Sequence, residues 1–197
     1  EELQYAHNKA PEKLLIQSEA CVDSEIPVWQ DDAWYWSKEA TDWGWDWAPE
    51  KDKHLHPKYA PVYRYAGDII GCLNNWVDGW VDWNMVLDKQ GGPNWFKNWC
   101  IAPVIVDPDK DEVYFTPLYY TMAHFSKYIR PGALRIGFEN TDKNLQVTAA
   151  QNLDGSIAVV ILNKDIAAKN FTLSLGESSI EIQINAQAIQ TIMLPKS

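Results

Sequence analysis

The distribution of tryptophan constrains this chain more than any other feature. All 11 tryptophans lie between Trp29 and Trp99, and six of them fall within residues 20–58. That segment has neither helical nor strand periodicity, which is typical of a functional loop rather than a connection inside a compact domain. Each indole N–H needs a partner when it is buried, so these side chains cannot all share one core. We expect about half of them to pack and the others, Trp29 and Trp34 among them, to line a cleft.

Charge and composition exclude several classes of partner. Seventeen Lys and Arg against 27 Asp and Glu give a net charge of −10, which repels phosphate backbones and anionic lipid head groups. We therefore expect no nucleic-acid partner. No apolar run approaches the roughly 18 residues of a membrane-spanning helix. His54 and His56 have the spacing of two metal ligands on a strand, but no cysteine lies nearby and we expect no metal site.

The chain changes character after residue 130. Phe138 and Phe171 are the only later aromatic residues, and the sequence becomes short runs of alternating apolar and polar residues. Asp154-Gly155 lies between two such runs and is typical of a hairpin turn, because these residues accept positive φ angles. Residues 131–197 are therefore predicted to form an antiparallel β-sandwich.

Residues 1–130 instead alternate strands and helices. An apolar run over 13–18 predicts a buried parallel strand, 59–76 an amphipathic helix, and 77–83 a second buried strand. A second helix is predicted from Thr116-Pro117 to Pro131-Gly132. Two such units are a quarter of a (β/α)₈ TIM barrel, which needs about 250 residues. We therefore expect the C-terminal part of a barrel whose N-terminal half is missing. The chain begins at Glu1 without a signal-peptide pattern. We therefore expect either a mature protein from which a leader was cleaved or a piece of a longer protein.

Glu19 is the first candidate for chemistry. It ends a buried strand, and in parallel α/β folds catalytic side chains project from the carboxyl ends of strands. A solvated loop carboxylate is the alternative. In the second strand, alternation sends Trp80 and Asp82 to one face and Val81 and Trp83 to the other. A buried Asp must be hydrogen-bonded or paired, so we expect a structural role for Asp82.

Several motifs together resemble a known family. In this order and at these distances, 18-SEAC, 79-GWVDWN, 91-GGPNWFKNW, 104-VIVD and 117-PLYYTMAHFSKYI resemble the C-terminal portion of glycoside hydrolase family 30, the glucosylceramidase-like β-glycosidases. The resemblance implies a TIM barrel fused to a β-sandwich, and retaining hydrolysis without a cofactor. It also implies that Glu19 is the nucleophile, Trp83 the substrate-stacking tryptophan and Asn98 a pocket residue.

The same resemblance implies what this chain lacks. The family's acid/base is a Glu after the fourth barrel strand, and no part of this sequence corresponds to it. We therefore expect a fragment, or one chain of a split enzyme, that is inactive alone. Its expected partners are the missing barrel half and a β-linked glucoside or oligosaccharide. Glucosylceramidase, β-glucosidase and β-1,6-glucanase activities all occur in the family. Secretion or a periplasmic location is implied by the resemblance alone.

Two other functions remain open from the residues. The chain could be a non-catalytic carbohydrate-binding protein that uses its Trp-rich loop, with Glu19 as a hydrogen-bond acceptor. Alternatively, residues 131–197 could be an accessory sandwich that only braces a catalytic domain.

Overall fold

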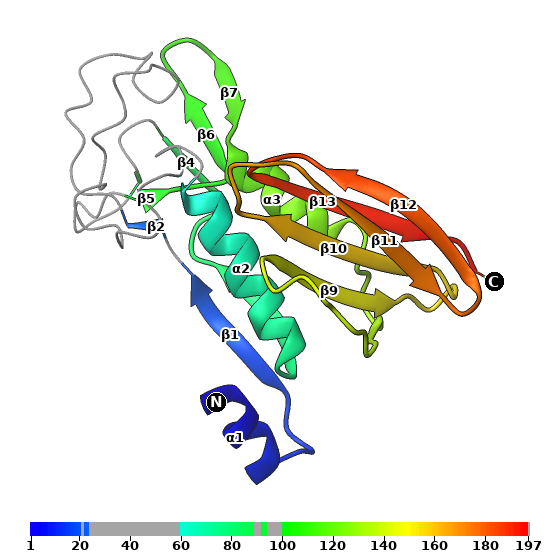
Figure 1. Cartoon of the computed structure of the whole chain (residues 1–197). Coiled ribbons are helices and arrows are strands. Elements are labelled where there is room, and N and C mark those ends of the chain that lie inside the picture. Colours follow the sequence, from blue (N-terminus) through cyan, green and yellow to red (C-terminus); the bar gives the residue numbers. More distant parts are fainter. Residues whose placement is uncertain (21, 24–59, 89–91, 94–99, 197) are drawn as a thin grey trace. The chain divides into compact units, whose positions relative to one another are not determined.

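A computed structural model gives the fold of residues 1–20, 22–23, 60–88, 92–93 and 100–196 (Figure 1). The chain divides into two compact units, Glu1–Met122 and Ala123–Ser197. The boundary that we predict between residues 130 and 131 stays a prediction.

The first unit contains short strands and the helices of the predicted barrel part. Its elements are α1 (Glu2–Lys9), β1 (Leu15–Ala20), β2 (Val22–Asp23), α2 (Ala60–Asn74), β3 (Val77–Asp82), β4 (Val86–Asp88), β5 (Cys100–Ile101), β6 (Val104–Asp107), β7 (Glu112–Phe115) and the start of α3 (Pro117–Ser126). The second unit contains β8 (Leu134–Arg135), β9 (Leu145–Gln151), β10 (Ile157–Asn163), β11 (Lys169–Leu175), β12 (Ser178–Ile184) and β13 (Ala188–Leu194).

The predicted strand–helix–strand unit is present. β1 and β3 pair in parallel, and α2 lies between them in the sequence. Val62, Ala66 and Ile69 recur at helical spacing on α2 and are buried, as an amphipathic helix requires. A core cluster joins Tyr65 of α2 to Ile105 of β6 and Leu118 of α3, with Ala20 and Trp80 packed against it. No helix in the described ranges has the length and apolar character needed to cross a bilayer.

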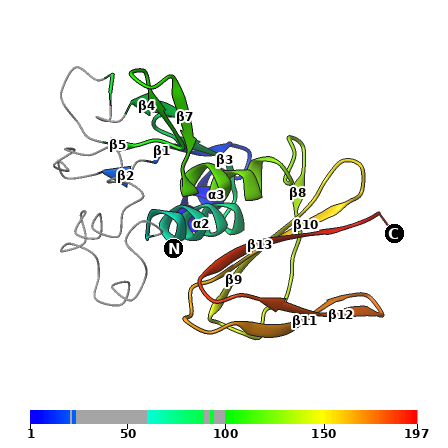
Figure 2. The ribbon, with the colours of Figure 1, turned by 90° about the horizontal axis from the view of Figure 1, so that it is seen from above.

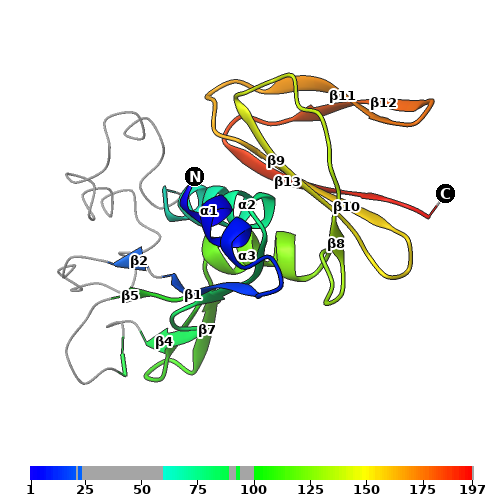
Figure 3. The same ribbon diagram turned by 90° about the horizontal axis from the view of Figure 1, so that it is seen from below.

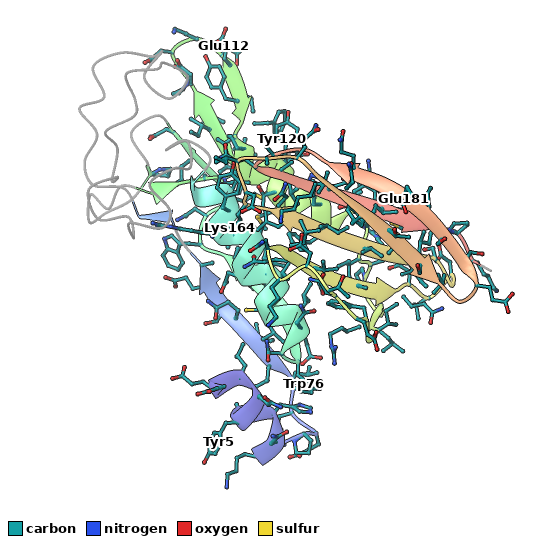
Figure 4. The ribbon with its side chains drawn as sticks, in the orientation of Figure 1. Tyr5, Trp76, Glu112, Tyr120, Lys164 and Glu181 are labelled. Atoms are coloured by element: carbon teal, nitrogen blue, oxygen red, sulfur yellow. The ribbon has the colours of Figure 1, made fainter. Side chains whose placement is uncertain are left out.

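The end of α2 differs from the expectation. The sequence stripe continues the helix to Trp76, but the helix ends at Asn74, and Trp76 takes a left-handed backbone conformation with φ of 61°. Its ring stacks on His7 of α1, with ring centroids 4.6 Å apart (Figure 4). The contact with a separate helix replaces the helical contact that periodicity alone predicts.

A small sheet follows β3 that the sequence analysis did not predict. β4 pairs in parallel with β6, which forms an antiparallel hairpin with β7. Thr116, at the base of this hairpin, is buried and donates its hydroxyl to the Ala102 carbonyl, 3.1 Å away. This hydrogen bond fixes the residue that lies between the hairpin and the start of α3.

The second unit is the predicted antiparallel sandwich. One sheet has the strand order β13-β10-β9-β8, and β11 pairs with β12 in the other. Figures 2 and 3 show the β11–β12 hairpin as a separate layer beside β9, β10 and β13. The core between them contains Leu145, Val159, Ile161 and Ile184. The predicted hairpin turn is confirmed between β9 and β10, where Gly155 has a φ of 87°.

Buried asparagines hold the sandwich connections. Asn163 is fully buried, and its side-chain amide donates to the carbonyls of Ala167 and Asn185 at 3.0 and 2.9 Å. Asn152 similarly donates to the Tyr128 carbonyl at 2.9 Å. These bonds satisfy the N–H groups of two buried side-chain amides, which would otherwise lack partners.

His124 connects α3 to β13. Its Nδ1 lies 2.8 Å from the Thr191 hydroxyl oxygen, and that hydroxyl donates to the His124 carbonyl at 3.2 Å. The Thr191 hydroxyl thus contacts both the ring and the backbone of His124. Burial lowers the pKa of His124.

This environment predicts a pH dependence of local stability. An unfolded histidine takes up a proton near pH 6.5, above the lowered pKa of the folded state, so stability is complete above that pH and falls as the pH drops toward the folded pKa. The loss is at most about 1.4 kcal/mol per pH unit, the limit for one proton. Hydrogen-exchange protection of residues 188–194 in the intact protein measures it. His124→Gln should remove this slope, and an unchanged slope would contradict the assignment.

Candidate active site

The carboxyl ends of β1 and β3 lie side by side. Ala20 pairs with Asp82 in the parallel ladder, and the Trp83 backbone N–H donates to the Ala20 carbonyl at 2.8 Å. Glu19 precedes Ala20 and Trp83 follows Asp82, so the two predicted site residues flank one paired position. This is the edge of a parallel sheet at which ligands bind in α/β folds.

A register shift in β1 decides which face Glu19 occupies. Gln17 pairs with Trp80 and Ala20 with Asp82, so β1 uses three residues where β3 uses two, as in a β-bulge. Ala20 packs on the core cluster under α2, and successive strand side chains alternate between faces. Glu19 therefore points to the face away from α2. Without the extra residue, alternation from Gln17 would give Glu19 the same face as Gln17 and Trp80.

The face away from α2 is open. Ile16, Val81 and Trp83 are 60%, 47% and 56% exposed, and Glu19 is exposed beside them. Gly79 belongs to the same face, since a Cβ added there would lie 3.7 Å from the Ile16 side chain. A carboxylate thus stands on an apolar and aromatic surface, an arrangement suited to a ring that has both hydroxyls and C–H faces.

Asp82 faces the other way and has the structural bonds that we predicted. Its Oδ1 accepts the Tyr65 hydroxyl at 2.5 Å and the Trp83 N–H at 2.9 Å. Oδ2 is buried without a hydrogen-bond partner among the described residues. Burial raises the pKa of Asp82, while the two hydrogen bonds oppose that rise.

A second hydrogen bond joins α2 and β3, and here the donor lies on β3 and the acceptor on α2. The Trp80 indole N–H donates to Asp68 Oδ2 of α2 at 2.7 Å, and the Trp80 ring meets Tyr65 edge-on, with ring centroids 5.0 Å apart. Tyr65 and Asp68 are three residues apart and share a helix face, just as Trp80 and Asp82 share a strand face. Tyr65 and Asp68 are not among the residues predicted from the sequence, although their three-residue spacing, with a Trp-x-Asp strand after the helix, is a signal that could have indicated them.

Three further predicted site residues, Trp29, Trp34 and Asn98, lie outside the described residues. The structure therefore brings together Glu19 and Trp83. No group of three or more His, Cys, Asp or Glu side chains suited to a metal ion occurs within the described ranges. Cys72 is buried with a free thiol, and burial, aided by the nearby Asp68, raises its pKa to about 11.

The two units define a class of protein: the end of a (β/α)₈ barrel, with a carboxylate where its strands terminate, followed by a β-sandwich. The sequence model of the glycosyl hydrolase family 30 TIM-barrel domain matches residues 1–129. That of the family 30 β-sandwich domain matches residues 132–192. The chain belongs to glycosyl hydrolase family 30.

Curated relatives and solved structures agree with this membership. The chain is 36% identical to putative glucosylceramidase 4 of Caenorhabditis elegans, over 81% of this chain and 26% of the relative. It is 34% identical to lysosomal acid glucosylceramidase of Mus musculus, over 85% of this chain and 28% of the relative. The SrfJ structure from Salmonella typhimurium covers 99% of the chain at 25% identity, with a TM-score of 0.80, and 38% of SrfJ is matched. The chain thus spans about a quarter of the length of these two curated relatives.

The raised pKa of Cys72 predicts an inert thiol. A pKa of about 11 leaves far less than 1% thiolate at neutral pH, whereas an unfolded cysteine with a pKa near 8.5 reacts readily. We expect iodoacetamide to alkylate Cys72 at least about tenfold more slowly in the native protein than in denaturant. Peptide mapping by mass spectrometry measures this site apart from the other two cysteines. Equal rates in both states would contradict the burial.

Proposed function

We propose that this chain is the C-terminal part of a retaining β-glycoside hydrolase in which Glu19 is the nucleophile and Trp83 stacks on the sugar. The observation that carries the proposal is the shared position of these two residues. They lie on one face, at the ends of adjacent parallel strands joined by the Trp83 N–H to Ala20 carbonyl bond of 2.8 Å. Family membership supports a glycoside hydrolase, and the geometry supports this assignment of roles.

The proposed reaction is a double displacement. A Glu19 carboxylate oxygen bonds to the anomeric carbon while the glycosidic C–O bond breaks, and a second carboxylic acid protonates the departing oxygen. Water then attacks the same carbon, gives its proton to that second carboxylate, and frees Glu19. Asp82 is the adjacent carboxyl group, but it faces α2. The acid/base is therefore proposed to come from the missing N-terminal barrel half, with its carboxyl about 5–5.5 Å from that of Glu19.

The open apolar face supports that partner. Ile16, Val81 and Trp83 are exposed on the β1–β3 face, and a two-stranded parallel sheet is not stable with such a face in water. In an intact barrel this face points into the interior. We therefore propose that the chain alone does not turn over substrate and that the rest of the barrel completes the site.

The proposed substrate is a β-linked glucoside or oligosaccharide, held without a cofactor by Trp83 together with Asn98, Trp29 and Trp34. This range of substrates is supported by relatives described as a glucosylceramidase and as an endo-1,6-β-D-glucanase. The Trp-rich segment 20–58 would extend the cleft beyond the first sugar. Secretion or a periplasmic location is proposed on the resemblance alone.

Glu19→Gln in the intact protein tests the nucleophile. The amide keeps the shape but removes the attacking oxygen, so we expect kcat on an aryl β-glucoside to fall by roughly 10³-fold or more. Glu12→Gln is the matched control, because Glu12 is another exposed carboxylate, near Lys13. It should leave kcat unchanged. Substantial activity in Glu19→Gln would refute the assignment.

Covalent trapping then separates hydrolysis from simple binding. A 2-fluoro glycoside with a good leaving group should leave a sugar ester on the Glu19 peptide, which mass spectrometry detects. A carbohydrate-binding protein that uses Glu19 only as an acceptor would bind sugar and remain unlabelled.

Trp83→Ala tests the stacking surface. Loss of the indole face should lower kcat/KM by about 10- to 100-fold, and Trp83→Phe should restore most of it because a phenyl ring still stacks. Tyr120→Ala is the control, since Tyr120 is an exposed aromatic residue on α3 (Figure 4). Equal effects of Trp83→Ala and Tyr120→Ala would argue against a sugar-facing role.

A further inference from the structure

We propose that Tyr65 and Asp82 are positioning residues for the reaction, because their hydrogen bond sets the backbone from which Trp83 and Glu19 project. The proposal rests on the proposed function of Glu19 and Trp83. Neither Tyr65 nor Asp82 faces the side on which substrate would bind. Both act through the backbone of the strand ends.

The contacts form one continuous path across the two strands. Asp82 Oδ1 accepts the Tyr65 hydroxyl at 2.5 Å and the Trp83 N–H at 2.9 Å. The same Trp83 N–H also points at the Ala20 carbonyl, 2.8 Å away. One backbone hydrogen is thus shared between a carboxylate and the residue next to Glu19, in a three-centre bond. A shift of the Asp82 carboxylate changes where that hydrogen lies, and with it the alignment of the two strand ends.

Tyr65 is anchored well enough to fix this path. It is 4% exposed and packs with Ile105 and Leu118 in the core cluster. The helix that carries it has 15 residues. The Tyr65 hydroxyl therefore approaches Asp82 from a fixed direction.

The chemistry of Asp82 explains why the hydroxyl matters. The other carboxylate oxygen, Oδ2, is buried without a partner among the described residues. Within the described residues, the Asp82 carboxylate is therefore held by the two donors to Oδ1, the Tyr65 hydroxyl and the Trp83 N–H. Deleting the Tyr65 hydroxyl leaves the Trp83 N–H as the remaining donor seen there, and the carboxylate is then free to turn. A misplacement of about 1 Å at reacting groups can cost about 100-fold in rate.

The Trp80–Asp68 bond provides a matched control. It joins the same helix to the same strand and is similarly short, but it does not touch the Trp83 N–H. Trp80→Phe removes the indole N–H while keeping an aromatic ring against Tyr65. The Trp80–Asp68 bond is exposed and the Tyr65–Asp82 bond part-buried, so the two losses of stability can differ. A role in general stability predicts that kcat falls only where the thermal midpoint falls, whereas a positioning role predicts a difference in kcat that the thermal midpoints do not account for.

The experiment measures kcat and KM of the intact protein on an aryl β-glucoside, and separately the thermal midpoint of its unfolding. We expect Tyr65→Phe to lower kcat by about 10- to 100-fold with KM changed less than about threefold, because ground-state stacking on Trp83 persists. Trp80→Phe should keep kcat within about threefold at a similar thermal midpoint. Equal kcat values in the two variants, or a rise in KM at unchanged kcat, would overturn the proposal.

A pair of Asp82 variants tests the same path if Tyr65→Phe does not fold. Asp82→Asn keeps an acceptor oxygen for both donors and should retain kcat within about threefold, whereas Asp82→Ala removes the acceptor and should lose about 10- to 100-fold. Equal losses in both would overturn the proposal.

Glu19→Gln distinguishes a failure of the positioning role from a failure of the proposed function. If it is inactive while Tyr65→Phe is normal, only the positioning role fails, and if it is active, the proposed function itself fails.

Discussion

The parallel ladder between β1 and β3 is the constraint on which the first unit depends. Two strands in parallel register bring their carboxyl ends to one edge, and α2 covers one face of the pair through Tyr65 and Asp68. The opposite face is therefore left open, with Ile16, Val81 and Trp83 exposed on it. Glu19 and Trp83 are neighbours because of this pairing, although 64 positions separate their residue numbers in the sequence.

The bulge in β1 adds a second condition that no composition argument reveals. An extra residue between Gln17 and Ala20 reverses the side-chain alternation, so Ala20 fills a small space under α2 while Glu19 points outward. Ala suits the inner position because the cluster of Tyr65, Ile105 and Leu118 already occupies the volume beneath it. A fold can thus place a charged side chain on its open face while its neighbour packs in the core.

The sequence predicts the elements with strong periodicity and misses those set by distant contacts. The helix through Val62, Ala66 and Ile69 and the sandwich hairpin at Gly155 follow from local patterns, and both are confirmed. The predicted end of α2 was wrong: the helix ends at Asn74, and Trp76, with a φ of 61°, stacks on His7 of another helix. Glu19 was predicted as a site residue from its place at a strand end and from the family resemblance. Tyr65 was not, because a tyrosine on an apolar helix stripe is indistinguishable from packing until the strand opposite it is known.

The two units bury polar groups for different physical purposes. In the sandwich, the buried Asn163 and Asn152 side-chain amides donate to backbone carbonyls, so their gain is the avoided cost of unpaired buried donors. Under β3, the part-buried Tyr65–Asp82 bond and the exposed Trp80–Asp68 bond join two elements, and aliphatic side chains could fill the part-buried volume instead. Aliphatic packing is non-directional and tolerates sliding, whereas reciprocal hydrogen bonds between Tyr65 and Asp82 and between Trp80 and Asp68 fix one register of helix on strand. Of the two bonds, only that of Tyr65 reaches the carboxylate that also accepts the Trp83 N–H, so its direction bears on where Trp83 lies.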